Sequence, residues 1–270
     1  MHSKQKFKIE IPYIFKLLEI LEKGEGAKEG IKEESGAGEN RVITFIEWLK
    51  YIGSIEIVNK EIVLTQLGKT YLKIRDSHDY VEPLMLYYLA KNPNLEKNDG
   101  HYYISEVLNE YLSTKVADYD NKITLESAKE YMISFGADPK YPDFIKDAVK
   151  VLEESETGFG KMGILEKIID DKKSPVYEIH SYWVEPLVGA YIIYDLWKEG
   201  QTEMQISSII NDKYHLGRIF LMDEEAIIET LEEIQALGLI DIDLTGGLYQ
   251  IRKSHRYTKE DILNMMIENS

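Results

Sequence analysis

The sequence contains no cysteine among its 270 residues. Disulfide bonds, thiolate zinc sites and cysteine nucleophiles are therefore excluded together. Long apolar runs are also missing, since no stretch approaches the roughly 20 apolar residues that cross a bilayer as a helix. Residues 1–8 lack the apolar centre of a secretory signal. We therefore expect a soluble, cytoplasmic protein with no membrane partner.

Basic residues are scarce relative to acidic ones. Lysine and arginine number 32 against 48 aspartates and glutamates, which gives a formal net charge of −16. Because phosphate contacts supply most of the non-specific affinity for nucleic acid, such a chain must bind nucleic acid through a local basic surface or a partner. The overall charge alone favours a protein–protein role. The length of 270 residues allows one large core or two to three small ones, and the hydrophobic content of 44% is that of a globular protein.

A helix that ends at a glycine and continues into a two-stranded ribbon is predicted near the N-terminus. The helix covers residues 42–51 and runs through Ile52-Gly53 into strands over 54–58 and 61–64, joined by Asn59-Lys60. The short turn between two β-patterned stretches is typical of a hairpin. This order is typical of a winged-helix unit, with the hairpin as the wing.

The same order is predicted again near the C-terminus. An amphipathic helix over residues 223–236 runs through Leu237-Gly238 into strands over 239–244 and 248–252, joined by Thr245-Gly246-Gly247. Two such units indicate a protein that holds nucleic acid or a partner, rather than one built around a catalytic cleft.

The fold class that follows is mainly α, with two winged-helix units with small β-hairpin wings flanking a helical middle domain. The predicted divisions are 1–77, 78–200 and 201–256, followed by 257–270 as a tail or a short helix over 259–268. Apolar spacing predicts the remaining helices. They cover 11–22, 65–74, 81–90, 104–112, 125–134, 142–153, 164–170, 187–197 and 204–213, with a loop or weak helix over 24–38 and a strand or turn over 218–221.

Two local motifs have both a functional and a structural interpretation. Gly68-Lys69-Thr70 ends like a phosphate-binding loop, but Val63 stands where that loop needs its first glycine, so a closing helix capped by Thr65 is favoured. Asn40-Arg41, at the start of the predicted helix, could hold a phosphate, and the alternative is an ordinary N-cap at Asn40 after a loop.

No catalytic residue can be identified from the sequence. The six histidines are scattered, and no pair has the i, i+4 spacing of a helical zinc site. The carboxylates lie at the spacing of solvated helix faces, and no acidic cluster of the kind that binds catalytic magnesium is found. We therefore expect no cofactor and no metal site.

Basic residues are concentrated in two places. Residues 38–76 contain six lysines and arginines against five acids, with Lys60 at the predicted wing tip, and residues 252–256 are the most basic short segment. Residues 201–243 contain two basic residues and ten acids, which favours an interaction or dimerisation role for the second unit. The predicted nucleic-acid contacts are Asn40, Arg41, Lys50, Lys60, Arg252, Lys253 and Arg256.

Several stretches together resemble the bacterial domain-of-unknown-function family four-thousand-and-seven. In the first half these are Gly38 with Asn40-Arg41-Val42, Trp48, Gly53-Ser54-Ile55-Glu56, Leu64-Thr65-Gln66-Leu67-Gly68, and Glu82-Pro83-Leu84 with Tyr87-Tyr88-Leu89. In the second half they are 158–163, 217–224 and 245–252. Family members usually open with Gly-His-Glu-Thr-Phe, whereas this chain has Phe7-Lys8-Ile9-Glu10-Ile11-Pro12.

The resemblance implies a place beside the sulfur-transfer components of DNA phosphorothioation systems, in a family that includes the SspB-type component implicated in DNA nicking. The leading hypothesis is a non-catalytic DNA-binding or scaffold subunit of a DNA-modification or phage-defence complex. Its partners would be DNA and the other proteins of that complex. The alternatives are a metal-dependent nickase of the same systems, and a protein-binding adaptor or transcriptional regulator, with a homodimer left open.

Overall fold

The computed structural model describes residues 8–24, 28–91, 100–118, 120–134, 142–171, 174–244 and 249–270. The described chain is mainly helical with small antiparallel sheets, as the sequence predicts. No helix within these ranges combines the length and apolar character that crossing a bilayer would require. The predicted Thr245-Gly246-Gly247 turn lies outside the described residues.

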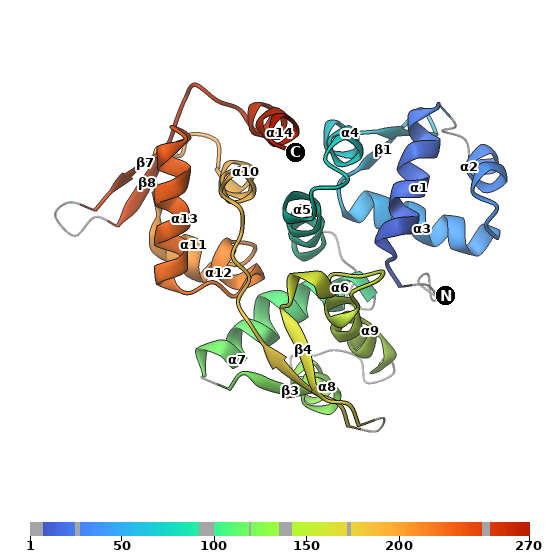
Figure 1. Ribbon diagram of the computed structural model, residues 1–270, viewed down its shortest axis with the longest axis horizontal. Coiled ribbons are helices and arrows are strands. Elements are labelled where there is room, and N and C mark those ends of the chain that lie inside the picture. The colour runs from blue at the N-terminus through green and yellow to red at the C-terminus, as the bar shows by residue number, and fades with distance from the viewer. Residues whose placement is uncertain are drawn as a thin grey trace.

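Four helices and one hairpin form the N-terminal part (Figure 1). They are α1 (Ile11–Glu22), α2 (Lys28–Ser35), α3 (Glu39–Tyr51), β1 (Ile55–Val58), β2 (Glu61–Leu64) and α4 (Gln66–Lys73). The prediction for 11–22 is confirmed, with Pro12 in the first turn, where its missing N–H leaves no helix hydrogen bond unmade. The predicted cap at Asn40 is wrong. Gly38 has the extended backbone of the N-cap, and Asn40 already lies inside the first turn.

The hairpin between β1 and β2 closes through a two-residue turn. Val58 pairs with Glu61, and the intervening Asn59 and Lys60 have φ values of 52° and 71°. Two successive positive φ angles are characteristic of a type I′ turn, whose twist matches that of the strands. Thr65 then caps α4 by accepting a hydrogen bond from the Gly68 N–H at 3.0 Å. The predicted hairpin and the Thr65-capped closing helix are both confirmed.

The middle part contains more strand than the sequence predicts. Its elements are α5 (His78–Ala90), α6 (Gly100–Glu106), a π-helical segment (Val107–Leu112), α7 (Ser113–Ala117), β3 (Lys122–Thr124), α8 (Leu125–Ser134), α9 (Pro142–Glu153), a 3₁₀ turn (Gly160–Met162), β4 (Leu165–Ile169) and β5 (Val176–Ile179).

The three strands of this part form an antiparallel sheet in the order β3-β5-β4. The helical prediction for 164–170 is therefore wrong. The apolar pattern of so short a stretch is compatible with either a helix or a strand. It forms a strand because it hydrogen-bonds to β5. β5 itself has the alternating burial of a half-buried strand, with Tyr177 and Ile179 inward.

The C-terminal part combines helices with a second small sheet. Its elements are α10 (Pro186–Leu196), β6 (Met204–Gln205), α11 (Ile206–Asn211), α12 (Leu216–Ile219), α13 (Glu224–Ala236), β7 (Ile240–Asp243), β8 (Gln250–Lys253) and α14 (Lys259–Glu268). The sheet order is β6-β8-β7. Two predictions need correction. β6 occupies the start of the expected 204–213 helix, and the expected strand or turn over 218–221 begins inside α12, which ends at Ile219.

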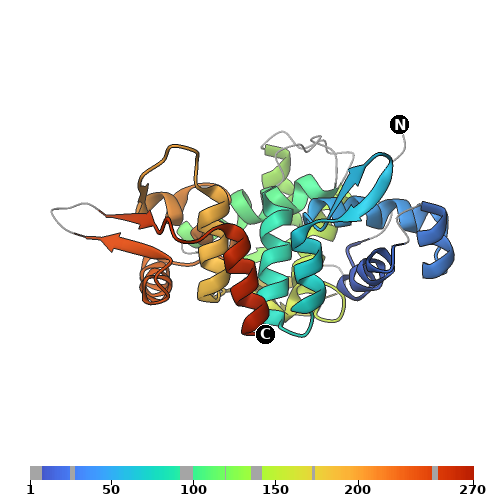
Figure 2. The same cartoon turned by 90° about the horizontal axis from the view of Figure 1, so that it is seen from above.

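The segment 257–270 contains a capped helix rather than a frayed tail. Thr258 and Asp261 form a reciprocal capping box at the start of α14. The helix buries Ile262, Leu263 and Met266. It packs against both α4 and α10, so that α10, α14, α5 and α4 lie side by side across the middle of the molecule (Figure 2). The first and last parts of the chain are thereby in direct contact.

Candidate functional site

Arg41, a predicted phosphate contact, is half-buried and contacts other residues of the N-terminal part. Its guanidinium lies 2.8 Å from a carboxylate oxygen of Glu10 and 4.3 Å from the centre of the Tyr13 ring. Glu10 belongs to the segment where this chain departs from the family's usual opening. The ion pair with Glu10 and the cation–π contact with Tyr13 hold the guanidinium of Arg41 in place. Arg41 therefore has a structural role within the N-terminal part.

The other predicted residues of this part differ in exposure. Asn40 is exposed on the first turn of α3, and Lys50 pairs with Glu47 at 2.9 Å on the same helix. Lys60 is exposed at the turn of the β1–β2 hairpin. Within the described ranges Lys60 makes no ion pair.

The predicted C-terminal contacts lie elsewhere. Arg252 pairs with Asp243 at 3.4 Å, and the ammonium of Lys253 lies 5.5 Å from the centre of the Tyr194 ring. Arg256 is exposed after β8. The hairpin β1–β2 and the strands β7 and β8 lie at opposite ends of the molecule, so the fold does not bring the two predicted basic groups together (Figures 1 and 2).

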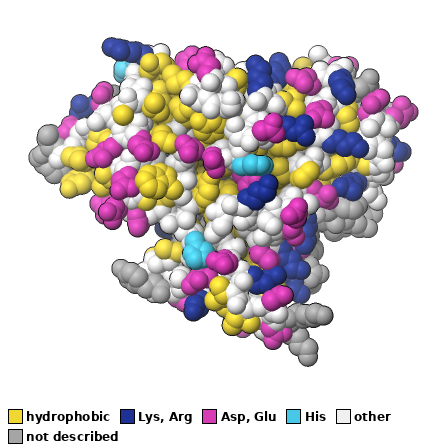
Figure 3. Space-filling view, viewed as in Figure 1, with side chains coloured by type: hydrophobic (Ala, Val, Ile, Leu, Met, Phe, Trp, Pro, Cys, Tyr) yellow, Lys and Arg dark blue, Asp and Glu magenta, His cyan; other side chains and the backbone are white. Residues whose placement is uncertain are grey.

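Lys69 and Lys73 are basic residues that the site prediction omitted. They are four residues apart on α4, both are exposed, and no acidic partner is found for either in the part of the chain that the structure describes. Their i, i+4 spacing puts them on one face and could have indicated them from the sequence. Figure 3 shows Lys and Arg side chains over the N-terminal elements, whereas acidic and hydrophobic side chains dominate the end that carries α13 and β7.

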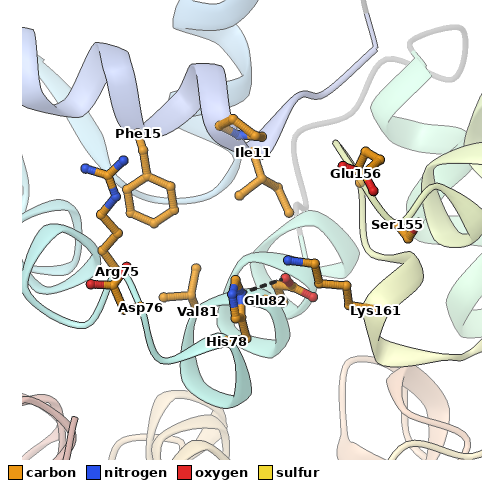
Figure 4. Close-up of a pocket in the computed structure, with 12 residues that line it drawn as sticks. Ile11, Phe15, Arg75, Asp76, His78, Val81, Glu82, Ser155, Glu156 and Lys161 are labelled. Atoms are coloured by element: carbon orange, nitrogen blue, oxygen red, sulfur yellow. Dashed lines mark hydrogen bonds and ion pairs between the residues drawn. The ribbon is translucent and has the colours of Figure 1, made fainter.

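A separate hollow of about 180 Å³ lies where α1, the start of α5 and the segment after α9 meet (Figure 4). Two stretches cited for the family resemblance supply part of its lining, through Glu82 and through Gly158 with Lys161. Ile11-Pro12, which also line it, come from the segment where the chain departs from the family's usual opening. Its other polar lining comes from Arg75 and Asp76 between α4 and α5, from His78 at the start of α5, and from Ser155 and Glu156 after α9. The fold therefore gathers residues of distant segments around one small, mixed-charge cavity.

Glu82 is the most buried ionisable group of this hollow. Its side chain is only 5% exposed, and its carboxylate lies 3.1 Å from Nδ1 of His78, which is largely exposed. Burial raises the pKa of Glu82, and the opposing effects of His78 and Lys161 only reduce that rise. The prediction had missed this pair because it began the helix at Val81. A helix starting at His78 would have shown the His–Glu spacing of four.

The hollow does not form a ready metal site. Across the described segments, no three His, Asp or Glu side chains gather closely enough to hold a metal ion. Lys161 and Arg75 also line the hollow that contains the carboxylates of Asp76, Glu82 and Glu156. The arrangement, a buried carboxylate beside an exposed imidazole and two cationic side chains, is suited to holding a small polar group.

Two of the three comparisons with known proteins find similar proteins. No curated protein matches the chain. Two solved structures are similar over 99% of this chain and 86% of their own length: magnesium ion-bound SspB, with 14% identity and a TM-score of 0.70, and SspB, with 13% identity and a TM-score of 0.72. At this identity the similarity establishes the fold alone. The model of the family described as "Protein of unknown function (DUF4007)" matches residues 6–267, and the chain therefore belongs to the DUF4007 family.

Proposed function

We propose that this chain is the DNA-contacting subunit of a bacterial DNA-modification or defence complex of the phosphorothioation type. Its N-terminal part, with α3 as the helix and β1–β2 as the wing of a winged-helix unit, makes the contact. The observation that carries the proposal is the set of exposed lysines Lys60, Lys69 and Lys73, which have no acidic partner in the described ranges. In a chain of net charge −16, exposed lysines that no carboxylate neutralises are the residues best suited to contact phosphates.

The ion pairs of the N-terminal part sharpen the choice of residues. Arg41 and Lys50 have carboxylate partners, so a phosphate would have to compete with Glu10 or Glu47 for them. Lys60 has no such competitor among the described residues. We therefore assign the principal phosphate contacts to Lys60, Lys69 and Lys73, with exposed Asn40 as a neutral hydrogen-bonding group on α3.

The shape of the hairpin supports a role as a wing. It projects from the body of the molecule (Figure 2), and its outer residues Ile57 and Val58 are 52% and 44% exposed. The type I′ turn holds Lys60 at the end of this projection. A short, stiff ribbon with apolar flanks and a lysine at its tip fits alongside a nucleic-acid backbone.

Family membership supplies the biological context of the proposal. The resemblance to the DUF4007 family implies a DNA phosphorothioation setting, and the similar solved structures are of SspB. One of them contains magnesium. Because no cluster of three ligand side chains occurs among the described residues, we assign no metal-dependent step to this chain.

The test is fluorescence anisotropy of a labelled 20-base-pair duplex, titrated with the full chain across a salt series. Lys60→Asn removes the wing-tip charge and keeps a residue that tolerates positive φ. Lys69→Gln/Lys73→Gln removes the α4 charges. Lys122→Gln, an exposed lysine of β3, makes the same charge change elsewhere and is the matched control.

Wild type should bind with log K falling by about 0.9 per phosphate contacted for each unit of log salt concentration. Lys60→Asn should lower that slope by about one contact and the α4 double variant by about two. The assignment would be contradicted if all four proteins bound the duplex with equal affinity, or if Lys122→Gln lost as much affinity as the Lys60 and α4 variants. A parallel assay of supercoiled plasmid with magnesium or EDTA detects nicking, which would favour the enzyme alternative.

A further inference from the structure

A second hollow, of about 220 Å³, lies between α13 and β7 at the opposite end of the molecule. On α13 it is lined by Ile228, Leu231, Glu232 and Gln235, which have the i, i+3, i+4, i+7 spacing of one helix face. Ile206, Ile242 and Leu244 complete the lining. The hollow is therefore a groove with an apolar floor, which we call the α13–β7 groove.

The groove is held in shape by a hydrogen bond between its two sides. The side-chain oxygen of Gln235 accepts from the backbone N–H of Ile242 at 2.6 Å. Leu231 is fully buried beneath the groove, whereas Leu244 at its edge is 45% exposed. Because the floor is fixed and the edge leucine faces water, an apolar side chain entering the groove would bury surface without rearranging the helix.

The surroundings of the groove are strongly acidic. α13 contains Glu224, Glu225, Glu229, Glu232 and Glu233 and no basic residue. β7 adds Asp241 and Asp243. Of the basic residues nearby, Arg252 pairs with Asp243. An occupant that presents positive charge around one or two aliphatic side chains therefore has both the charge and the polarity to match.

We propose that the α13–β7 groove binds a basic amphipathic segment of another protein. Leucine or isoleucine side chains of that segment enter the groove beside Leu244. Its flanking lysines or arginines face Glu232 together with Glu224 and Glu225, which lie on the same side of α13 as the groove, whereas Glu233 lies on the other side. This protein contact is additional to the proposed DNA contact and does not depend on it. The two lie on opposite ends of the molecule.

Charge argues against the two other occupants of an exposed groove. Nucleic acid would bring phosphates against the glutamates of α13, with no free arginine or lysine of that helix to receive them. A second copy meeting the same face would bring its own α13 glutamates against these, which is unfavourable for a symmetric contact.

The chain offers closely matched controls for testing this groove. Glu232→Lys reverses a charge within the groove, and Glu233→Lys makes the same change at the next residue, outside the lining. Leu244→Ser removes the edge leucine, and Leu237→Ser removes a leucine that is 47% exposed but does not line the groove. All four positions are exposed, so none of these substitutions removes a core side chain.

The experiment selects binders from a displayed library of random 16-residue peptides on the immobilised full chain. Selected sequences should combine Lys or Arg with Leu or Ile. Synthetic copies should bind wild type, Glu233→Lys and Leu237→Ser within twofold of each other, and bind Glu232→Lys and Leu244→Ser at least tenfold more weakly. Acidic or purely polar selected peptides, equal binding to all variants, or self-association that Leu244→Ser abolishes would each overturn the proposal.

Discussion

Lys259, in the first turn of α14, donates a hydrogen bond to the carboxylate of Asp195, a residue of α10 that lies 64 positions earlier in the chain. The other carboxylate oxygen of Asp195 accepts from Lys91, just after α5, and from the Tyr87 hydroxyl at 2.6 Å. The Asp195 side chain is only 7% exposed. One buried carboxylate therefore joins three helices that are distant in sequence.

Asp195→Asn should destabilise the fold by about 2 to 4 kcal/mol at pH 7, because two lysines lose their shared anion. Burial raises the pKa of Asp195, but the hydrogen bonds from Lys259, Lys91 and Tyr87 outweigh it and place the pKa below its usual range. The stabilisation is therefore present above about pH 4 and is lost as pH falls through the lowered pKa. Urea unfolding at pH 7 and pH 3 measures both effects.

The control for this substitution is Asp241→Asn, which removes an exposed carboxylate of β7 and should change stability by under about 0.5 kcal/mol. A deficit of Asp195→Asn that stays the same at pH 3 would show that the ion cluster is not its cause.

His215 should make stability rise with pH across the mildly acidic range. The side chain is buried and, among the described residues, its Nδ1 makes no hydrogen bond. Burial lowers the pKa of His215 to about 4, below the usual value near 6.5. Protons therefore favour the unfolded chain between these values, and stability on the order of 3 kcal/mol is lost as pH falls from 6.5 to 4.

His215→Gln removes this titrating group, so its urea midpoint should change less between pH 7 and pH 4.5 than that of wild type. If the urea midpoints of the two proteins changed equally with pH, His215 would be excluded as a source of acid sensitivity.

The pair in the small hollow of Figure 4 should be energetically coupled. His78→Gln leaves the buried Glu82 carboxylate without its partner and should cost about 1 kcal/mol at pH 7. In a Glu82→Gln background the same change should cost almost nothing. A double-mutant cycle by thermal unfolding gives the coupling directly, and a value within about 0.3 kcal/mol of zero would refute the pairing.

The sign of the pH effect at Glu82 is opposite to that at Asp195. The raised pKa means that the protonated acid is favoured in the folded state. Stability associated with Glu82 is therefore complete below its unfolded pKa of about 4.3 and decreases as pH rises. The stability of Glu82→Gln relative to wild type should therefore increase between pH 4 and pH 8.

Gly68, the glycine of the Gly-Lys-Thr tripeptide, should be required for packing. A Cβ at this position would lie 2.1 Å from the carbonyl oxygen of Ser54, a backbone atom that cannot turn aside. Gly68→Ala should therefore lower stability by about 2 kcal/mol or more. Gly38→Ala, where a Cβ meets nothing within 4 Å, is the control and should cost about 1 kcal/mol or less through the helix cap. Equal losses in both would contradict the packing role.

Local signals in the sequence were sufficient to predict the elements that begin at a capping residue or are joined by a characteristic turn. Thr65 and Asp223 accept hydrogen bonds from the first turns of α4 and α13, as capping rules predict. The helices over 125–134 and 142–153 match the predicted bounds. The hairpin after α3 matches the prediction because Asn59 adopts a positive φ readily, which allows the two-residue turn between the strands.

Features that depend on distant partners could not be predicted in the same way. β4 is a strand because it pairs with β5, and this pairing overrides the helix-like spacing of its apolar residues. Asp195 and Lys91 are ordinary surface residues in the sequence, and only the packing of α10 against α5 joins them. Likewise, nothing local in Arg41 indicates that Glu10 occupies its guanidinium.

The position of α14 has a mechanical consequence. Because this helix packs on α4 as well as α10, the hairpin end and the α13–β7 end are linked through the middle part and again through α14. The part that carries the β1–β2 hairpin is therefore connected to the other end in two ways, through the middle part and through α14. Rotation of one end against the other would have to open the contact between α14 and α4, and the hydrogen bonds of Asp195 to α14 and α5 oppose the same movement.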